Sequence, residues 1–544
     1  MAAEIAEQSQ SSVLLGLQWR ANNYQSLHAR AVEREKTWKQ KVEALRHLVS
    51  QQQERIDALL LENEKLRARQ TWLEQQVFGR KTEQTEHVDP IACGGGAGIS
   101  EAAAARKHRG QQPGTNGHGR KRQSGLTTVE IPLDLPEDKR CCPACGKALR
   151  PFPWTEDSEE IHWEVRLLRR VYRRTRYLPA CKCGVLPGIV AAPLPPKLIP
   201  KGMFSTEFWV RLLMQKFLFQ HPLYRVRQAL ALEGLAVSQG TLTGGLKRIG
   251  ALVQPLYARI LERNRAADHW HMDETRWMVF AELEGKVGHR WWLWVAVTAD
   301  TCVYILDPSR SAAVPQTHLE GKTGGILNAD RYSAYKTLDK VEIAFCWSHV
   351  RRDFLRVRDE YRRLQHWGQS WVERIDELFE LNARRLELRA LPDAFAVEQQ
   401  ALREAMAAMA EARDRELGDA ALHPAQNKAL ESLCNHWKGL TIFVDHPEIP
   451  MDNNEAERRL RNPVVGRKNY YGSGSIWSGS LSAVLFTIFQ TLLINHLDPK
   501  EFLLAYFQVC AQEGGHPPKD LDAWLPWNLT EEQKASWRYP KKPP

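Results

Sequence analysis

A heptad repeat in residues 38–77 restricts the possible folds of this chain more than any other feature of its sequence. The first series of positions is Val42, Val49, Ile56, Asn63, Gln70 and Val77. The second series, three residues after the first, is Leu45, Gln52, Leu59, Leu66 and Leu73. Such alternating steps are typical of a coiled coil, and an Asn at a core position commonly fixes a parallel dimer. We predict a helix that forms a homodimer or higher oligomer, with an intramolecular helical hairpin as the alternative.

The composition describes a large protein with a basic balance. Its 544 residues correspond to about three or four domains, and 43% hydrophobic residues allow a sizeable core. A net charge of +10 is compatible with a polyanionic partner. The N-terminus lacks the pattern of a signal peptide. No run of about 18 uncharged apolar residues occurs, so we expect no membrane span and interpret residues 481–497 as a buried core helix.

Ten cysteines in a chain of this kind indicate thiols or metal ligands rather than disulfides. Cys142 and Cys145 lie in C-C-P-A-C-G, whose tight turn directs two thiolates at one point, and Cys181 and Cys183 supply a second pair. We predict a structural Zn²⁺ site in residues 131–192. The alternatives are that one cysteine of the group, which includes Cys141, is not a ligand, or that no metal binds.

Basic residues surround this cysteine module. Residues 81–130 are polar, Gly-rich and basic, and form either a linker that lies along phosphates or a merely solvated one. The arginines between the two cysteine pairs predict a basic surface, which contacts either DNA or solvent. They are Arg166, Arg169, Arg170, Arg173, Arg174 and Arg176.

Residues 193–262 have the pattern of a helix-turn-helix. Gly234 is expected to end the first helix, and Ser238 to cap the second by accepting a backbone hydrogen bond. Gly244 and Gly245 each disfavour the second helix by about 1 kcal/mol relative to Ala. This pair of helices therefore either reads DNA in the major groove or serves only to form a core.

From residue 268 the pattern changes to strands. Five β-branched and aromatic runs are separated by turn-like segments, and charged helical segments follow over residues 351–440. The expected architecture is an α/β domain with a helical insertion.

Three acids in this region fit the needs of phosphoryl transfer. Two Mg²⁺ ions about 3.5–4 Å apart can activate a nucleophile and stabilise the leaving oxygen, and Mg²⁺ prefers oxygen ligands. Asp273 lies in the first strand, Asp330 at a strand end, and Glu457 at the start of a helix. With 65 acidic residues in the chain, the pattern alone makes this trio one candidate set among many.

The same segments resemble the DDE transposases of the bacterial insertion sequence 66 family over nearly the whole chain. The motifs that carry the resemblance are VFGRKTEQ, CCPACG with ACKCG, HPLYRVRQALALEGLAVSQGTL, HMDETRW, NADRYSAY, CWSHVRRDF, DNNEAERRLRNPVVGRKNYYGSGS and DLDAWLPWN. The resemblance implies an RNase H-like fold whose DDE acids are Asp273, Asp330 and Glu457, with Mg²⁺ or Mn²⁺ as the catalytic metal. It also implies double-stranded DNA as partner, at the element ends and the target, and allows small accessory proteins.

Asp452 and Glu455 are rivals for the third acid. We interpret Asp452 as a helix N-cap and Glu455 as its capping-box partner, which leaves Glu457 on the same helix face as Asn453. Residues expected to contact DNA are Arg467, Lys468, Asn469, His349 and Arg352. A structural role for His349 is the alternative.

The predicted fold class is a mixed multidomain one. It comprises an α-helical coiled coil (1–80), a basic linker (81–130), a small zinc module (131–192), a helix-turn-helix-like region (193–262), an α/β RNase H-like catalytic domain (263–480) with a helical insertion at about 351–450, and C-terminal helices (481–544). The predicted function is cleavage of insertion-sequence ends and joining of 3′-hydroxyls to target DNA by a cytoplasmic, nucleoid-associated enzyme. The alternatives are a catalytically inactive DNA-binding regulator and an RNase H-like resolvase or nuclease.

Overall fold

A single long helix, α1 (Ala2–Phe78, 77 residues), begins the protein. The computed structural model describes residues 2–78, 129–141, 143–149, 161, 166–177 and 189–539. The helix predicted over the heptad repeat is confirmed, and it extends to Ala2. The described apolar heptad residues Val42, Leu45, Val49, Ile56, Leu59 and Leu66 are all exposed on this helix. The dimer stays a prediction.

Residues 80–166 form a compact unit separate from the rest of the chain. Its described part has a short 3-10 helix, η1 (Glu137–Lys139), and an ion pair between Arg140 and Asp134. The backbones of Cys141 and Ala148 also form an isolated antiparallel β-bridge. Cys145 is exposed, whereas the predicted ligands Cys142, Cys181 and Cys183 lie outside the described residues. The zinc site therefore stays a prediction, as does the role of the linker.

A small antiparallel pair, β1 (Arg176–Tyr177) and β2 (Val190–Ala191), follows in the larger unit. The described arginines before and within β1 are exposed, as expected for a basic surface. Two of them have protein partners: Arg170 pairs with Glu207 at 3.2 Å, and Arg174 donates to the Ala192 carbonyl at 2.9 Å.

Helices occupy the segment expected to be a helix-turn-helix. They are α2 (Thr206–Leu213), the π-helical η2 (Met214–Leu218), α3 (Leu223–Leu232) and α4 (Gln239–Ala266). Gly234 adopts a positive φ of 88° directly after α3, and the Ser238 hydroxyl accepts from the Thr241 N–H at 3.1 Å. The predicted helix boundaries at these two residues are confirmed.

The two glycines of α4 have different surroundings. A Cβ on Gly245 would lie 1.9 Å from Cη2 of the buried Trp209, whereas a Cβ on Gly244 would meet nothing within 4 Å. Gly245 therefore allows the α2 tryptophan to pack directly against the α4 backbone.

This difference predicts opposite effects for two alanine substitutions. We expect Gly245→Ala to destabilise the protein by about 1–3 kcal/mol, because the added methyl overpacks against Trp209. Gly244→Ala, the matched control, should stabilise it by up to about 1 kcal/mol through helix propensity. Urea denaturation of both variants measures the difference, and equal effects from the two would contradict this packing.

The predicted five strands form one mixed sheet. They are β3 (His269–Val279), β4 (Arg290–Val297), β5 (Cys302–Asp307), β6 (Ile326–Ala329) and β7 (Glu342–Phe345), in the order β5-β4-β3-β6-β7. β3, β4 and β5 form an antiparallel meander, whereas β6 is parallel to β3 and β7 is parallel to β6. A sixth strand, β8 (Gly472–Ser473), pairs with the end of β3. This mixed sheet with its flanking helices is consistent with an RNase H-like domain.

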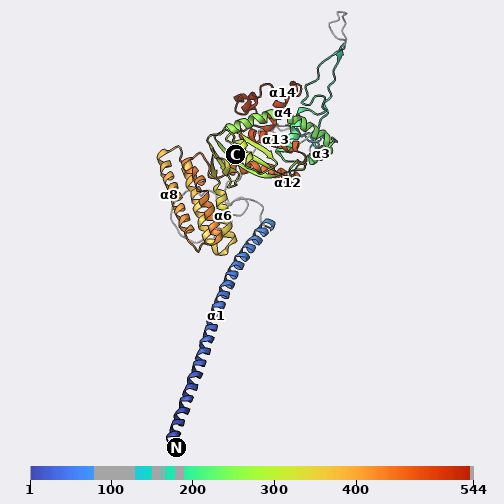
Figure 1. The fold of residues 1–544 in the computed structure, drawn as a ribbon. Helices are drawn as coiled ribbons and strands as arrows, with labels where there is room; N and C mark the ends of the chain where they lie inside the picture. Colours follow the sequence, from blue (N-terminus) through green and yellow to red (C-terminus); the bar gives the residue numbers. More distant parts are fainter. Residues whose placement is uncertain are drawn as a thin grey trace. The chain divides into compact units, whose positions relative to one another are not determined.

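The remaining elements are helical (Figure 1). Between β5 and β7 lie α5 (Ala313–His318) and η3 (Tyr335–Thr337). After β7 come α6 (Trp347–Glu360), η4 (Arg362–Leu364), α7 (Gln365–Glu387), α8 (Pro392–Leu417), α9 (Pro424–Asn435), α10 (Trp437–Leu440) and α11 (Ile442–Asp445). The chain then returns to the sheet with α12 (Asn454–Tyr470), followed by α13 (Ile476–Ile494), α14 (Pro499–Gln512), η5 (Asp522–Trp524) and α15 (Glu531–Ser536).

The buried residues of α6 to α11 form a hydrophobic core of their own, which includes Trp347, Phe354 and Trp371. A larger core joins α2, α4, α13 and α14 to β4 and β5. The α6–α11 helices are therefore a separately packed layer inserted between β7 and α12.

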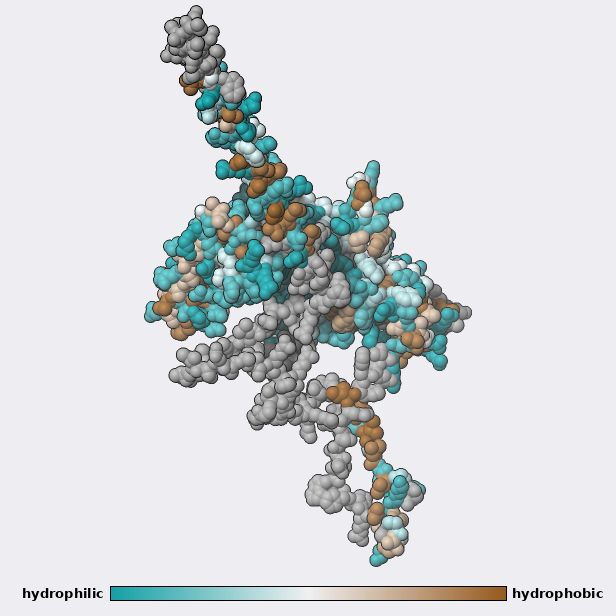
Figure 2. Space-filling model, turned by 90° about the horizontal axis from the view of Figure 1, so that it is seen from below, coloured by the Kyte–Doolittle hydropathy of each residue, from teal (hydrophilic) through white to brown (hydrophobic). Residues whose placement is uncertain are grey.

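Among the described residues, α13 is the one helix long and apolar enough to cross a membrane by length and composition. However, 72% of its most apolar stretch is buried within the protein, where it packs on β5 and α4. The interpretation of this segment as a core helix is confirmed. On the face shown in Figure 2, the described residues are mainly hydrophilic, with apolar ones interspersed.

Candidate active site

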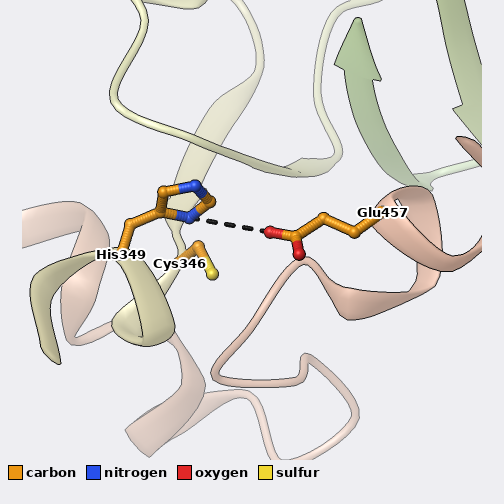
Figure 3. Close-up of side chains that lie close together, drawn as sticks. All are labelled: Cys346, His349 and Glu457. Atoms are coloured by element: carbon orange, nitrogen blue, oxygen red, sulfur yellow. Dashed lines mark ion pairs between the residues drawn. The ribbon is translucent and has the colours of Figure 1, made fainter. Parts of the chain in front are cut away.

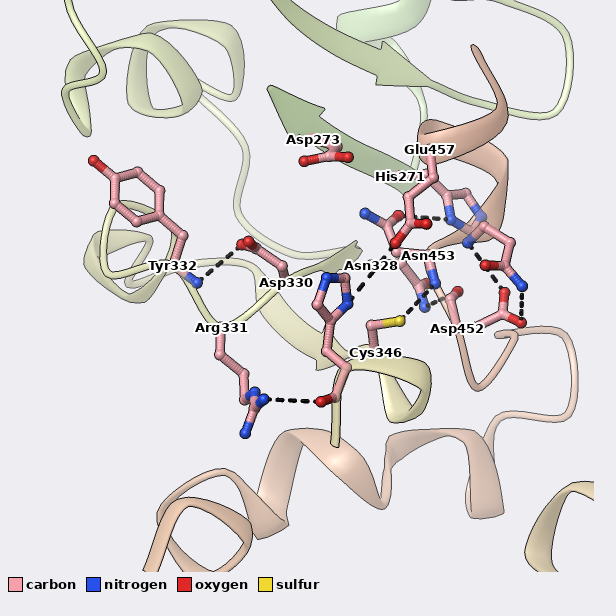
Figure 4. Close-up of polar contacts among 12 residues, drawn as sticks. His271, Asp273, Asn328, Asp330, Arg331, Tyr332, Cys346, Asp452, Asn453 and Glu457 are labelled. Carbon is pink, nitrogen blue, oxygen red and sulfur yellow. Dashed lines mark hydrogen bonds and ion pairs between the residues drawn. The ribbon is translucent and has the colours of Figure 1, made fainter. Parts of the chain in front are cut away.

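The parallel pairing of β3 with β6 brings two of the predicted acids to the same level. His271 of β3 is aligned with Asn328 of β6. Two residues further along each segment are Asp273, within β3, and Asp330, directly after β6. Because side chains two residues apart in a strand share a face, this register puts both carboxylates on one side of the sheet. Figure 4 shows them directed at a common space.

The end of β7 continues this arrangement. Ala329 is aligned with Phe345, so Cys346 follows β7 as Asp330 follows β6. The Cys346 N–H donates to the Ala329 carbonyl at 3.2 Å. Since α6 begins at the next residue with Cys346 as its N-cap, His349 lies in the first turn of that helix, close to the ends of the strands.

Helix α12 brings the third acid to the sheet. Its N-cap, Asn453, is buried, and the side-chain amide donates to the Met272 carbonyl at 2.7 Å while the amide oxygen lies 3.2 Å from His271 Nδ1. The Asn453 backbone N–H donates to Cys346 Sγ at 3.3 Å. One turn later, Glu457 faces the same space as the other two acids (Figure 4).

The charges of the three acids act on one another. Burial, and to a lesser extent the negative charges of Glu274, Asp330 and Glu457, together raise the pKa of Asp273 to about 8. A hydrogen bond of 2.8 Å from the Glu274 N–H to Asp273 Oδ1 opposes this rise. A negative charge on Asp273 is therefore unfavourable unless a cation lies beside it.

Glu274 is adjacent in sequence but is occupied by protein partners. Its side chain is fully buried, forms an ion pair with Arg310, and accepts from the Tyr335 hydroxyl at 2.7 Å. The Arg310 guanidinium also stacks on Tyr332, 3.8 Å from the ring centroid. Alternation along β3 turns Glu274 to the face opposite Asp273, so it belongs to the core of the sheet.

The loop after β6 connects the site to the α6–α11 layer. The Tyr332 N–H donates to Asp330 Oδ1 at 2.9 Å, which closes a tight turn at the acid. The neighbouring Arg331 donates to Ser432 Oγ of α9 at 2.6 Å and forms an ion pair with Asp353 of α6. The position of Asp330 is therefore coupled to the packing of these helices.

Comparison with known proteins identifies the family. The model of the Transposase IS66 family matches residues 201–480, which include the whole sheet and the three acids. The chain belongs to this family. Its DDE transposase domain places the transposase among the polynucleotidyl transferases, which use divalent metal ions.

Three proteins of Sinorhizobium fredii (strain NBRC 101917 / NGR234) are similar to the transposase. The uncharacterized protein y4jD is 27% identical over 522 residues, which cover 90% of this chain and 99% of y4jD. The uncharacterized protein y4hP is 26% identical over 432 residues, covering 75% of this chain and 76% of y4hP. The uncharacterized protein y4qI is 28% identical over 363 residues, covering 63% and 66%. The similarity to y4jD extends well beyond residues 201–480.

The expected capping box at the start of α12 is wrong in its details. The N-cap is Asn453 rather than Asp452, whose carboxylate instead accepts from the Asn454 N–H at 3.1 Å. Glu455 forms ion pairs with Arg459 at 2.6 Å and Arg458 at 3.2 Å. The capping prediction fails because helical arginines next to Glu455 compete for its carboxylate. Both rivals of Glu457 nevertheless have other partners.

The residues expected to contact DNA have different surroundings in the transposase. Lys468 and Arg352 are exposed. Arg467 donates to the Arg276 carbonyl at 2.7 Å and to Thr275 Oγ1, and the Asn469 amide donates to a backbone carbonyl. His349 is largely buried beside Glu457. Arg467 and Asn469 thus attach α12 to its neighbours, and Asn469 is exposed as well, like Lys468 and Arg352.

Several polar residues that frame the site were not expected from the sequence. Asn328 is fully buried; it donates to the Pro450 carbonyl at 2.9 Å, and its amide oxygen lies 2.7 Å from His269 Nε2. Asn453 and Cys346 connect α12 to the sheet. The sequence did contain a signal for Asn328, because Asn is unfavourable in strands and yet occurs in the apolar run before Asp330.

Proposed function

We propose that the transposase cleaves DNA at the ends of its insertion sequence and joins the 3′-hydroxyls to target DNA, with Asp273, Asp330 and Glu457 as its catalytic acids. The observation that carries this proposal is the convergence of three carboxylates from β3, from the end of β6 and from α12 on one side of the sheet. The carboxylates come from separate elements, so each is held in place by a different part of the core.

The donor set fits Mg²⁺ or Mn²⁺. All three side chains offer carboxylate oxygens, the ligands that these hard cations prefer. Burial, together with nearby negative charge, raises the Asp273 pKa to about 8, and a divalent cation would stabilise the carboxylate in this environment. Asp273, Asp330 and Glu457 would hold the metal, and bound ions would supply activation of the attacking oxygen and stabilisation of the leaving oxygen.

The surrounding residues support the handling of DNA. Lys468 near the end of α12 and Arg352 in α6 are exposed, and both are suited to bind backbone phosphates. Arg467 acts through α12, whose position it fixes by its bonds to β3. Asn469 is exposed and remains a proposed DNA contact, while its amide donates to the Gln220 carbonyl.

We propose that α4 reads DNA in the helix-turn-helix-like region. Its outward face carries the exposed residues Gln239, Lys247 and Arg248. Gly245 lies on the inward face of α4, against Trp209, so a side chain at this position would not reach DNA. The exposed arginines of residues 166–176 extend the basic surface.

We also propose that α1 dimerises through its exposed apolar heptad positions. In the full chain, Ile56→Glu combined with Leu59→Glu should convert a dimer to a monomer, because charges at core positions oppose helix pairing. Analytical ultracentrifugation at micromolar concentration measures the mass. Gln51→Glu, outside the two heptad series, is the control and should leave the dimer intact. A monomeric unsubstituted chain would refute the pairing.

The other predicted parts complete the proposal. A Zn²⁺ ion bound by Cys142, Cys145, Cys181 and Cys183 would stabilise the module at 131–192, and the linker at 81–130 would follow phosphates. The division at about residues 80, 130, 192, 262 and 480 is proposed on the same basis. The enzyme would act on DNA inside the cell, with or without small accessory proteins.

Nicking of a supercoiled plasmid that carries the element's ends tests the function. We expect Mg²⁺-dependent strand cleavage at those ends, and joining when target DNA is added. Binding without cleavage would instead indicate a DNA-binding regulator, and cleavage without preference for the ends would indicate a nuclease. Footprinting with and without Mg²⁺ locates the bound sequence.

A further inference from the structure

A second group of potential metal ligands lies beside the acids. The ligand atoms of Cys346, His349 and Glu457 all lie within 4.8 Å of one another (Figure 3). Cys346 and His349 are three residues apart at the start of α6, a spacing that puts both on one side of a helix. Glu457 reaches them from α12, so the group joins two helices that begin at the same edge of the sheet.

The imidazole of His349 supplies a second, independent observation. Its Nδ1 is buried and makes no hydrogen bond among the residues that the structure describes. The nearest acid oxygen, Oε1 of Glu457, is 3.8 Å away, beyond hydrogen-bonding distance. Buried polar atoms are nearly always bonded, and here the unbonded nitrogen faces a thiol and a carboxylate. A metal ion at this point would satisfy it.

Burial raises the pKa of the Cys346 thiol to about 11, so its thiolate needs a cation beside it. Its sulfur accepts the Asn453 backbone N–H at 3.3 Å, the kind of outer bond that stabilises a thiolate ligand. That N–H belongs to the N-cap of α12, where the helix dipole favours negative charge. The nearby positive charge of Arg331 is compensated by Asp353. The thiol proton would be released to solvent when the ion binds.

We propose that Cys346, His349 and Glu457 form a binding site for a zinc-like ion that shares Glu457 with the catalytic metal site. One sulfur, one nitrogen and one oxygen suit Zn²⁺, whereas Mg²⁺ requires oxygen ligands. Zn–S and Zn–N bonds of about 2.3 and 2.0 Å require the ligand atoms to approach by roughly 1 Å, within the reach of side-chain rotation. Three protein ligands leave a fourth position for water or a phosphate oxygen.

Occupancy of this site has a consequence for the reaction. An ion held by Cys346 and His349 draws Glu457 away from the space that it shares with Asp273 and Asp330. Zinc would therefore compete with Mg²⁺ for one carboxylate and inhibit strand cleavage. This inhibition rests on the proposed function, whereas binding of the ion does not.

Metal analysis of the full chain tests the site without any use of activity. The chain is equilibrated with Zn²⁺, and separately with Co²⁺, whose thiolate charge-transfer absorption reports a cysteine ligand. We expect Cys346→Ser and His349→Gln each to lose one bound ion per chain relative to the unsubstituted protein. Cys434→Ser, at an exposed cysteine of α9, is the matched control and should lose none. Any zinc bound by the cysteines of residues 131–192 contributes equally to the ion count of all four proteins.

Thermal melts establish that each variant is folded before its ions are counted. If both folded variants bind as many ions as the unsubstituted chain, the site is refuted. In the nicking assay with Mg²⁺, half-inhibition of strand cleavage by Cys346→Ser should need at least about tenfold more Zn²⁺ than half-inhibition of the unsubstituted chain. Loss of a residue that only supports a metal ligand already lowers metal affinity by about 10–100-fold, so loss of a ligand should do at least as much. If Cys346→Ser still cleaves DNA and Zn²⁺ inhibits it as strongly as the unsubstituted chain, Glu457 is not shared between the two metal sites. Absence of cleavage in every protein would reject the proposed function but leave the ion count valid.

Discussion

Replacement of Asp273, Asp330 or Glu457 with alanine is expected to reduce strand cleavage at least about 10³-fold, because a lost metal ligand removes about 4 kcal/mol or more of transition-state stabilisation. DNA binding should persist, since the proposed DNA contacts are basic residues elsewhere. Cleavage by the purified variants on plasmid ends, and a gel-shift assay with the same DNA, measure the two properties separately.

Glu455→Gln is the matched control for Glu457→Gln. Glu455 lies on the same helix but is paired with Arg458 and Arg459, so its substitution should leave cleavage nearly intact. The assignment of the third acid would be reversed if Glu455→Gln abolished cleavage while Glu457→Gln retained it.

The stability of an Asp273 variant shows whether it loses cleavage because a metal ligand is missing or because the protein no longer folds. The pKa of Asp273 is raised to about 8 in the folded protein, mainly by burial, from an ordinary value of 3.8. The metal-free fold is therefore penalised increasingly as pH rises from the ordinary value towards the folded one. Asp273→Asn removes the charge, so we expect its melting temperature without metal to exceed that of the unsubstituted chain, more so at alkaline than at acid pH. Mg²⁺ should stabilise only the unsubstituted chain.

Arg310→Met is expected to destabilise the sheet by about 1–3 kcal/mol, because it leaves the buried Glu274 carboxylate without its half-exposed positive partner. Glu274 has a fully buried side chain, and Arg310 supplies its positive partner and stacks on Tyr332. The remaining Tyr335 hydroxyl can bond one carboxylate oxygen but cannot neutralise the charge. Urea denaturation followed by tryptophan fluorescence measures the loss.

The double variant Arg310→Met with Glu274→Gln is the test of the cause. With the charge removed, most of the lost stability should return, although the buried amide keeps its bond to Tyr335. The pKa of Glu274 is already raised by burial, and loss of Arg310 removes an interaction that lowers it. The defect of Arg310→Met should therefore shrink as pH falls and Glu274 is protonated. If the single variant Arg310→Met and the double variant lose the same free energy of unfolding, the loss comes from packing of the guanidinium and not from the Glu274 charge.

The strands were predictable because their sequence pattern depends on short-range periodicity. Runs such as that around Trp291 and Trp294 are buried and apolar, which a sequence records directly. Gly234 and Ser238 were predictable for the same reason, since a positive φ and an N-cap are local requirements.

The rest of the site depends on contacts between distant segments. Nothing near Asn453 indicates that it will bond Met272 and Cys346, which lie more than 100 residues earlier in the chain. Glu455 was misplaced because a local capping rule does not include competition from Arg459. Cys346 was overlooked because Glu457, whose carboxylate lies near it, belongs to α12, which follows the α6–α11 layer in the chain.

The alignment of His271 with Asn328 and of Ala329 with Phe345 also limits how such a sequence can change in length. One residue inserted within β3 or β6 would reverse the alternation and turn Asp273 or Asp330 to the opposite face. The loop between β3 and β4, where Val287 is fully exposed, carries no such restriction. Length variation among relatives should therefore gather in that hairpin and in the connections of the α6–α11 layer, while the spacing from each strand start to its acid stays constant.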